Sequence, residues 1–390
     1  MKTAYILASY RTPGCRAKKG KFKDMRPDDL ASVAIKGLVE RTGIDPATVD
    51  DVYLGCAFPE AEQGMNLGRI AAMKAGLPVE VPGQTINRFC SSGLQTISMA
   101  AERVMLGFAD CIVAGGAESM SCVPLGGLKY AANPGMMLDW PESYSSMGTT
   151  AELVAERYGI DRLMMDTFAA ASHQKAAAAI AGGRFTDEII PVEIEKETLV
   201  GGKIKRVKEL VTVDDGVRPG TTVETLAKLR PVFKLDGPVT AGNSSQTTDG
   251  AAFSLVVSEE YLKRLGKDPL ARFVAFTVKG VPPEVMGIGP IAAIPAVMKM
   301  AGLKLEDMGL IELNEAFAAQ ALACIKTLGI NSEITNVNGG AIALGHPLGC
   351  TGAKLTATLL HEMGRRKAQY GLVSMCIGGG MGAAGIFERL

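Results

Sequence analysis

The feature that most constrains the fold is an internal repeat, because two stretches of the 390-residue chain follow the same pattern. In each, an amphipathic segment leads to a glycine and then to a short β-like run. The glycine precedes the leucine of that run by 11 residues in both cases, from Gly43 to Leu54 and from Gly302 to Leu313. The amphipathic segments are residues 30–39 and 291–300. Weak self-similarity of this kind predicts a duplicated domain.

Each half then carries an irregular loop about 30 residues after a phenylalanine. The first loop holds Cys90, after Phe58, and the second holds His346, after Phe317. Both loops lead into a helix-like stretch, a strand-like run and glycines. Ligands of open α/β sheets gather at the carboxyl ends of strands, where such loops lie. We therefore expect Cys90 and His346 to face each other across a pseudo-twofold axis.

Alternating β-like and alanine-rich helical runs predict a parallel α/β architecture. Residues 119–248, between the halves, are richer in Met, Pro, Gly and charge, and we interpret them as an inserted lid or substrate-binding domain with a helix at about 161–181. A basic run at 203–208 is interpreted as a solvated edge, with contact to an anionic ligand group as the alternative. The predicted domains are 1–118 with 249–267, 119–248, and 268–390.

Composition limits the functions to consider. Apolar residues make up 47% and charged residues 21%, and 41 basic and 41 acidic residues cancel, which indicates a soluble globular protein and argues against nucleic-acid binding. No apolar run approaches the roughly 20 residues of a membrane span. The short apolar start does not fit a signal peptide, so we expect a cytoplasmic protein with eight reduced cysteines. Without a CxxC pair, and with three histidines, a metal site is not expected.

Cys90 is the strongest candidate nucleophile. Most cysteines are small buried hydrophobic residues, but this one stands before a stretch with helical periodicity. Unpaired N–H groups and the helix dipole favour a thiolate at such a place, so we expect Cys90 to alkylate at lower pH than the other seven cysteines. The apolar positions of the predicted helix are Leu94, Ile97, Ala101, Val104 and Met105.

His346 and Cys376 are the other candidates. His346 lies between Gly and Pro in a tight turn and is placed like a catalytic base, whereas His173 and His361 lie in helical runs and are expected at the surface. Cys376 ends a buried strand, where a core role is the ordinary interpretation, and it opens a glycine-rich turn whose N–H groups can bind an oxyanion. The remaining six cysteines are assigned to packing.

Six motifs together resemble the thiolases, specifically the degradative 3-ketoacyl-CoA thiolases (acetyl-CoA acyltransferases). They follow a family-like order and spacing over essentially the whole chain. The resemblance implies an α/β fold of duplicated half-domains with mixed sheets and buried helices in α-β-α-β-α layers, plus an inserted loop domain. The motifs are Asn87–Gly93, Gly115–Met120, Thr240–Ser245, Asn314–Ala318, Gly345–Pro347 and Cys376–Gly380.

The resemblance also implies a ping-pong reaction in which coenzyme A is a substrate and no cofactor is bound. Cys90 would carry the acyl group as a thioester, His346 would activate it, and Cys376 would be the second acid/base. Asn314, through a water, would join His346 in an oxyanion hole for the CoA-thioester enolate. The N–H groups of Cys90 and Gly378 would form a second hole for the tetrahedral intermediate.

The inserted region resembles the family's CoA-binding loop domain. Ser245 matches a position that contacts pantetheine, Arg218 one near the nucleotide end of CoA, and Met147 one that lines the acyl pocket. Ser146 stands where short-chain biosynthetic thiolases usually have histidine, which favours longer 3-ketoacyl chains. The same resemblance assigns three further residues to the substrate site: Ala241, Phe317 and Met286.

Other members of this fold remain alternatives. A short-chain biosynthetic acetyl-CoA acetyltransferase would have the same site. A ketosynthase would pair its nucleophile with His-His or His-Asn, and a non-catalytic acyl-CoA-binding relative would have lost one of the three reactive residues. The resemblance implies acyl-CoA and CoA as partners, a role in fatty-acid β-oxidation, and a homodimer or homotetramer. The apolar strand at 111–114 suits a buried interface between subunits.

Overall fold

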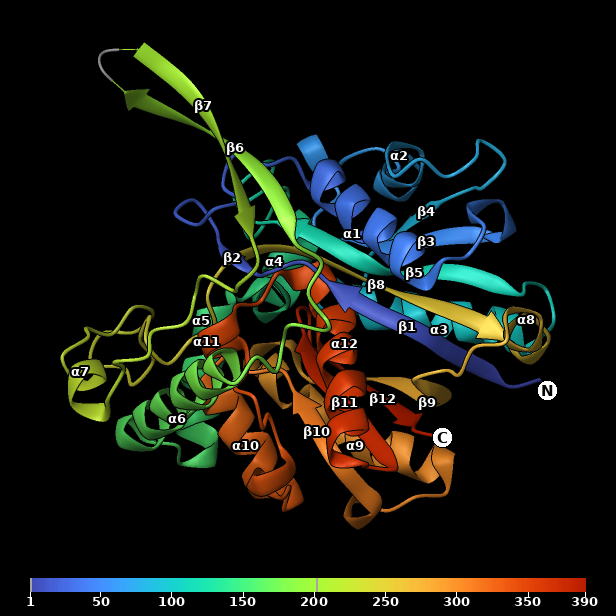
Figure 1. The fold of residues 1–390 in the computed structure, drawn as a ribbon. Helices are drawn as coiled ribbons and strands as arrows, with labels where there is room; N and C mark the ends of the chain where they lie inside the picture. The colour runs from blue at the N-terminus through green and yellow to red at the C-terminus, as the bar shows by residue number, and fades with distance from the viewer. Residues whose placement is uncertain (1, 201–202) are drawn as a thin grey trace.

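The computed structural model describes residues 2–200 and 203–390, without the side chains of residues 197–205 (Figure 1). The strands are β1 (Ala4–Arg11), β2 (Cys15–Arg16), β3 (Asp51–Gly55), β4 (Gln84–Ile86), β5 (Cys111–Ser119), β6 (Val192–Val200), β7 (Lys203–Val211), β8 (Thr248–Ser258), β9 (Ala271–Gly280), β10 (Met308–Leu313), β11 (Tyr370–Ile377) and β12 (Met381–Glu388).

The α-helices are α1 (Pro27–Thr42), α2 (Leu67–Lys74), α3 (Ser92–Met105), α4 (Pro134–Asp139), α5 (Met147–Tyr158), α6 (Arg162–Ala181), α7 (Val223–Ala227), α8 (Glu259–Leu265), α9 (Gly289–Ala301), α10 (Ala318–Leu328), α11 (Ala341–Leu344) and α12 (Leu348–Arg366). The 3-10 turns are η1 (Pro46–Thr48), η2 (Ala61–Gln63), η3 (Phe89–Ser91), η4 (Pro141–Tyr144), η5 (Pro283–Ile288), η6 (Leu305–Asp307) and η7 (Ser332–Ile334).

One ten-stranded sheet joins both halves of the chain. Its order is β10-β11-β12-β9-β1-β8-β5-β3-β4, with β2 paired to β8, while β6 and β7 form a separate hairpin. The halves meet where β1 pairs antiparallel with β9, with Tyr5 opposite Arg272 and Ile6 opposite Ala271. Strand β8 follows the inserted region in the chain and lies between β1 and β5 in the sheet. The exact domain boundaries stay a prediction.

The predicted duplication is visible in the strand pairing. In the first half β8 lies antiparallel between β1 and β5, and β3 is parallel to β5. In the second half β12 lies antiparallel between β9 and β11, and β10 is parallel to β11. A parallel bridge from Ile311 to Thr335 repeats the pairing of β3 with β4. Each half therefore has the same pattern of four strands. In both halves a further segment, β4 or the residues at Thr335, pairs in parallel with the outer strand of that pattern.

The expectation of a parallel sheet is wrong for the inner strands, and the mixed sheet implied by the family resemblance is observed. β11 and β12 are joined by three residues, and a connection this short can only link antiparallel strands. Gly379 and Gly380 make the turn with φ of 80° and 87°, a left-handed conformation that favours glycine.

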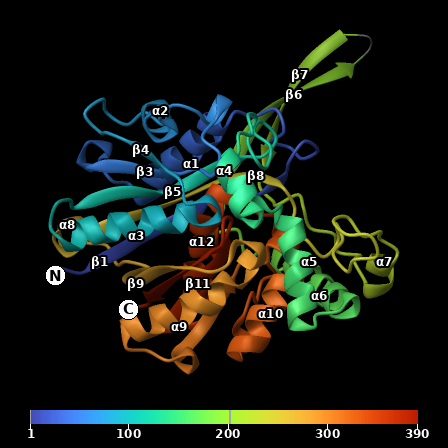
Figure 2. The same cartoon turned by 180° about the vertical axis from the view of Figure 1, so that it is seen from behind.

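Five layers follow from how the helices pack. α1 contacts β8, β5 and β1 on one outer face, and α9 contacts β12, β9 and β11 on the other. α3 and α12 lie between the two half-sheets and contact strands of both (Figures 1 and 2). Nearly every residue of α12 from Leu348 to Met363 is buried, as a helix in the middle layer requires. The layers are α-β-α-β-α, as predicted.

The inserted region contains α5, α6 and a projecting hairpin. The helix predicted at 161–181 is confirmed, because α6 spans Arg162–Ala181. The Asp161 side chain caps its N-terminus by accepting from the Met164 N–H at 2.8 Å. The β6–β7 hairpin extends away from the sheet (Figure 1). Of the basic run on β7, Lys208 is exposed and lies 2.7 Å from Glu193, which fits a solvated edge. The side chains of residues 203–205 lie outside the described part.

One helical segment among the described residues, Pro283–Ala301, is long and apolar enough to cross a membrane, with a mean hydropathy of 1.3 over its best window. Half of that window is buried inside the protein. Its main part, α9, packs on β9, β11 and β12, so this segment is a core helix.

Candidate active site

Cys90 lies in η3, which runs directly into α3, as the sequence predicts. Asn87 and Ser92 shape this turn. The Phe89 N–H donates to Asn87 Oδ1 at 2.8 Å, and the Ser92 hydroxyl donates to the Phe89 carbonyl at 2.7 Å. Phe89 adopts a φ of 42°, a left-handed conformation that costs free energy for an aromatic residue. The turn thus holds Cys90, 7% exposed, at the start of a buried helix.

The thiol of Cys90 is protonated at rest. Burial raises its pKa to about 11, although the N–H groups of Gly378 and of Cys90 itself bond to the sulfur and oppose the rise. The expectation of a thiolate is therefore wrong for the unliganded site, because loss of solvation outweighs the field of the helix end. The same two N–H groups are the predicted oxyanion donors. Their approach to the sulfur suits an oxygen that develops on a carbon bonded to it.

His346 is fixed by its backbone in the turn between α11 and α12. Its N–H donates to the Gln246 carbonyl at 3.0 Å and to Thr248 Oγ1 at 3.1 Å. Gly345, just before it, has a φ of 82°, and a Cβ there would lie 2.2 Å from Thr248 Oγ1. Only glycine fits this position, which explains the Gly-His-Pro sequence.

The imidazole of His346 is buried between two polar side chains. Nδ1 lies 2.6 Å from Thr351 Oγ1, and Nε2 lies 3.4 Å from Asn314 Nδ2. Burial lowers its pKa to about 3, and the nearby charge of Lys354 contributes to the shift. The ring is therefore neutral at pH 7 and able to accept a proton. Sequence reasoning missed Thr351, and its available signal was a hydroxyl in the first turn of the helix after His346.

Asn314 follows β10, and its N–H donates to the Ser374 carbonyl of β11 at 2.9 Å. Its side chain is buried with Nδ2 toward His346, while Oδ1 accepts no hydrogen bond from the described part of the protein. A buried oxygen of this kind usually has a water molecule or a polar ligand atom as its partner. The structure brings Asn314 and His346 together, and their assigned roles stay a prediction.

Cys376 lies near the end of β11, opposite Gly382 of β12. It is completely buried, and burial holds the pKa of its thiol well above the usual range, with the charge that Cys90 would carry as the next cause. Gly378, two residues after Cys376, directs its N–H at the Cys90 sulfur, so the chain brings the two cysteines into one site although they belong to different halves.

The two loops meet because the first turn of α3 packs against the first two turns of α12. A Cβ on Gly93 would lie 2.8 Å from the Ala353 nitrogen, and one on Gly352 would lie 2.3 Å from the Leu94 nitrogen. Leu348, two residues after His346, packs in the same apolar cluster as Cys90. Close approach at these glycines thus brings the Cys90 loop and the His346 loop to one place.

Three predicted substrate residues share an apolar cluster with Cys376. Met147, Met286 and Phe317 belong to the apolar cluster that contains this cysteine. The Met147 sulfur would lie 3.7 Å from a Cβ placed on Gly378. The oxyanion turn therefore faces an apolar wall, as an acyl pocket needs.

The residues predicted to contact CoA lie farther out. Ser245 is half-buried, and its N–H donates to the Ala316 carbonyl at 2.9 Å, next to Phe317. Ala241 and Arg218 are exposed. This gradient from buried to exposed fits a ligand that enters from solvent, and the individual CoA contacts stay a prediction.

The surface position expected for His173 is wrong. This residue is buried in α6, where its Nδ1 accepts the Arg218 N–H at 3.2 Å and burial lowers its pKa to about 4. The reason is tertiary, because α6 packs against α10 and α11 and leaves no exposed face at that position. His361 is half-buried and donates to the Ser9 carbonyl at 3.0 Å.

Comparisons with known proteins agree with this geometry. The family models described as "Thiolase, N-terminal domain" and "Thiolase, C-terminal domain" match residues 4–260 and 267–389. The chain is 55% identical to the 3-ketoacyl-CoA thiolase of Bacillus subtilis (strain 168) over 390 residues, which is 100% of both chains. It is 47% identical to the peroxisomal 3-ketoacyl-CoA thiolase 2 of Arabidopsis thaliana, covering 98% of this chain and 83% of that protein.

Two solved structures have the same fold. The acetyl-CoA acetyltransferase of Bacillus anthracis superposes with a TM-score of 0.91 at 40% identity, covering 100% of this chain and 99% of the other. Human mitochondrial 3-ketoacyl-CoA thiolase superposes with a TM-score of 0.90 at 39% identity and the same coverage. The two family models match nearly the whole chain in order, and relatives match it over its full length. The chain therefore belongs to the thiolase family.

Proposed function

We propose that the protein is a 3-ketoacyl-CoA thiolase, which uses CoA to cleave a 3-ketoacyl-CoA into acetyl-CoA and a shortened acyl-CoA. The observation that carries the proposal is the meeting of two half-domain loops at one buried site, with Cys90 from one half and His346 and Cys376 from the other. Relatives named 3-ketoacyl-CoA thiolase, similar over the full chain, support the same reaction. CoA acts as a substrate, and no resident cofactor is assigned.

The first half-reaction breaks the carbon–carbon bond. His346 takes the Cys90 proton, and the thiolate adds to the 3-keto carbon, whose oxygen then accepts from the N–H groups of Cys90 and Gly378. Collapse leaves the acyl group on Cys90 and expels the acetyl-CoA enolate. The protonated His346 and a water held by Asn314 stabilise the enolate oxygen. Cys376 then protonates the enolate carbon and becomes a thiolate.

The second half-reaction returns every proton. The Cys376 thiolate takes the proton of the incoming CoA thiol, and the CoA sulfur adds to the Cys90 thioester. The tetrahedral intermediate uses the same pair of N–H groups. Its collapse releases the shortened acyl-CoA, and Cys90 recovers its proton from His346. Because Cys90 and His346 are both neutral at rest, charge separation occurs only when the two groups exchange a proton.

We further propose that the preferred substrates are longer than acetoacetyl-CoA. Ser146, the position where short-chain enzymes usually have histidine, caps α5 by accepting the Thr149 N–H at 3.2 Å. The next residue, Met147, has its sulfur near Gly378, and Ser146 places no imidazole next to it. A short-chain acetyl-CoA acetyltransferase remains the second candidate, because the Bacillus anthracis enzyme of that name shares the fold.

The test is thiolysis measured with purified protein and a series of 3-ketoacyl-CoA substrates of increasing chain length. We expect kcat/KM to be higher for medium and long chains than for acetoacetyl-CoA. Activity confined to acetoacetyl-CoA would replace the proposal with the short-chain alternative. If protein that melts cooperatively cleaves none of the 3-ketoacyl-CoA substrates, both candidate functions are rejected.

A homo-oligomer is also part of the proposal, with the number of subunits left open. The strand predicted to form an interface is internal instead, because β5 lies between β8 and β3. The sheet ends at β4, directly before the Cys90 turn, and its open edge can pair with a second copy. An exposed apolar segment offers a further contact surface. Its exposed side chains are Leu125, Leu128, Tyr130, Met136, Met137, Leu138, Trp140 and Tyr144. Sedimentation of the purified protein tests this proposal, and a monomer at micromolar concentration would reject it.

We also propose a cytoplasmic location, as the sequence led us to expect. The plant relatives carry the word peroxisomal in their names, whereas the bacterial relatives carry no location. Fractionation of the source cells, followed by detection of the chain, is the direct test.

A further inference from the structure

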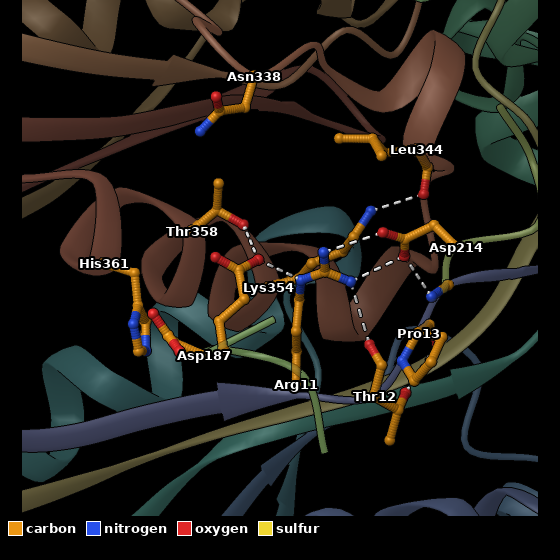
Figure 3. A network of polar contacts seen from close by, with 12 residues as sticks. Arg11, Thr12, Pro13, Asp187, Asp214, Asn338, Leu344, Lys354, Thr358 and His361 are labelled. Carbon is orange, nitrogen blue, oxygen red and sulfur yellow. Dashed lines mark hydrogen bonds and ion pairs between the residues drawn. The ribbon is translucent and has the colours of Figure 1, made fainter. Parts of the chain in front are cut away.

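A buried ionic cluster lies next to Leu344, two residues before His346 (Figure 3). Arg11 donates to Glu188 Oε1 at 2.5 Å and to both oxygens of Asp214 at 2.8 and 2.9 Å. The Thr358 hydroxyl donates to Glu188 Oε1 at 2.8 Å. These side chains are all at least 95% buried. The cluster joins β1, the inserted region and α12.

Lys354 completes this cluster from the second turn of α12, and it is 5% exposed. Its ammonium donates to the Leu344 carbonyl at 2.7 Å and to the Gly345 carbonyl at 3.1 Å. These are the last residue of α11 and the glycine directly before His346. Carbonyls at a helix end lack partners within the helix, so the ammonium satisfies groups that would otherwise be buried without one.

The charges in the cluster balance. Arg11 and Lys354 supply two cations, and Asp214 and Glu188 supply two anions. Burial lowers the pKa of Lys354 to about 8, and Asp214 and Glu188 oppose the shift while Arg11 adds to it. The other ionisable neighbours are the Cys350 thiol and the buried Glu312 carboxyl. Burial holds the pKa of Glu312 well above its usual range, Glu188 adds to the rise and Lys354 opposes it. Lys354 is therefore mostly charged at pH 7, and it is also the ionic group that acts on His346.

We propose that Lys354 is a positioning residue: its buried ammonium holds the carbonyls of Leu344 and Gly345 and thereby fixes the direction of the His346 ring. This inference rests on the proposed role of His346 as the base. An ammonium bonded to the turn acts on both the geometry and the charge of the ring, whereas a purely structural ion pair would affect only stability.

The experiment compares the wild-type enzyme with Lys354→Met, Lys354→Gln and Lys354→Arg. Lys175→Met is the matched control, because Lys175 also donates to a loop carbonyl, that of Thr335 at 3.3 Å, at a site away from His346. For each protein we measure kcat, KM and the pH profile of kcat/KM for thiolysis, with active sites counted by acyl-enzyme formation. The rate of Cys90 alkylation is recorded in parallel.

Lys354→Met is expected to lower kcat by about 10-fold or more with KM within about 3-fold, since the base is misplaced but binding is retained. The acid limb of its kcat/KM profile should move to higher pH, because a nearby cation no longer opposes protonation of His346. Lys354→Arg should keep the acid limb of the wild-type kcat/KM profile, and Lys354→Gln should shift that limb to higher pH. Lys175→Met should change neither kcat nor the acid limb.

An unchanged kcat and acid limb in Lys354→Met would overturn the inference, as would an equal loss in Lys175→Met. If Lys354→Met does not melt cooperatively, the Gln and Arg variants decide, and identical acid limbs in those two would overturn it. If the wild-type protein performs no thiolysis, the proposed function fails instead. The alkylation rate then still reports whether Lys354 controls the surroundings of Cys90 and His346.

Discussion

Thr351 Oγ1 lies 2.6 Å from Nδ1 of His346, and both residues are buried. On the other side of the ring, Nε2 faces the amide nitrogen of Asn314 at 3.4 Å. An amide nitrogen can only donate, so Nε2 is the acceptor and Nδ1 carries the hydrogen that Thr351 accepts. This assignment follows from the hydrogen-bond partners. It leaves Nε2 as the atom that takes a proton.

Removing the Thr351 hydroxyl should therefore impair the base. We expect Thr351→Val, which preserves shape, to lower kcat by about 10- to 100-fold while KM changes little, because the ring loses its orienting partner. Thr351→Ser keeps the hydroxyl and should stay within about 3-fold of wild type. Steady-state thiolysis kinetics test both, and a Val variant as active as the Ser variant would argue against an orienting role.

The crossing of α3 and α12 predicts a steep cost for a single methyl group. A Cβ on Gly352 would lie 2.3 Å from the Leu94 nitrogen, so Gly352→Ala should reduce the free energy of unfolding by about 3 kcal/mol or more, and lower activity as the loops separate.

Gly364 supplies the control in the same helix, since a Cβ there meets no atom within 4 Å. Gly364→Ala should be neutral or stabilising by about 0.5–1 kcal/mol, because alanine favours a helix over glycine. Urea denaturation of both variants provides the comparison. Similar stabilities would show that the helix crossing tolerates a side chain.

The raised pKa of Cys90 predicts slow alkylation near neutral pH in the unliganded enzyme. Its thiolate fraction should rise about tenfold per pH unit up to its pKa of about 11. The site-specific rate of iodoacetamide labelling, followed by peptide mass spectrometry between about pH 6 and 10, measures this. A plateau below about pH 8 would show a stable thiolate and restore the expectation from the helix end.

Cys376 should matter less for acyl transfer from an acyl-CoA to Cys90, where it protonates a thiolate that is already a good leaving group, than for proton transfer at carbon. We expect Cys376→Ala to form the Cys90 thioester from an acyl-CoA, yet to lose exchange of the acetyl-CoA methyl protons with deuterated water. Cys122→Ala, a half-buried cysteine outside the site, should retain both activities. Methyl exchange at the wild-type rate in Cys376→Ala would assign the second acid/base to another residue.

The sequence was most informative where the signal is local and periodic. Glycine spacing and the segments around Leu54 and Leu313 were enough to predict the duplication and the meeting of the Cys90 and His346 loops. Asp161 and the alanine-rich run after it predicted α6. The helix depends on neighbours in the chain, and the meeting of the loops was predictable because the same local pattern occurs in both halves.

The features that were missed or wrong depend on tertiary packing. His173 lies on a helix whose outward face is covered by other helices, and no periodicity within α6 indicates that cover. The thiolate expected at Cys90 fails because the amount of burial is set by both halves. Lys354 lies in an ordinary helical run, and its contact with the His346 turn exists only after α11 and α12 fold together.

The central claim is that Cys90 carries the acyl group, and mass spectrometry of the acyl-enzyme tests it most directly. The protein is mixed with an acyl-CoA, quenched in acid and digested, and the peptides are searched for the added acyl mass. We predict one adduct, on the peptide that contains Cys90, and neither adduct nor thiolysis in a folded Cys90→Ala variant. An adduct on a different cysteine, or thiolysis by Cys90→Ala, would contradict the account.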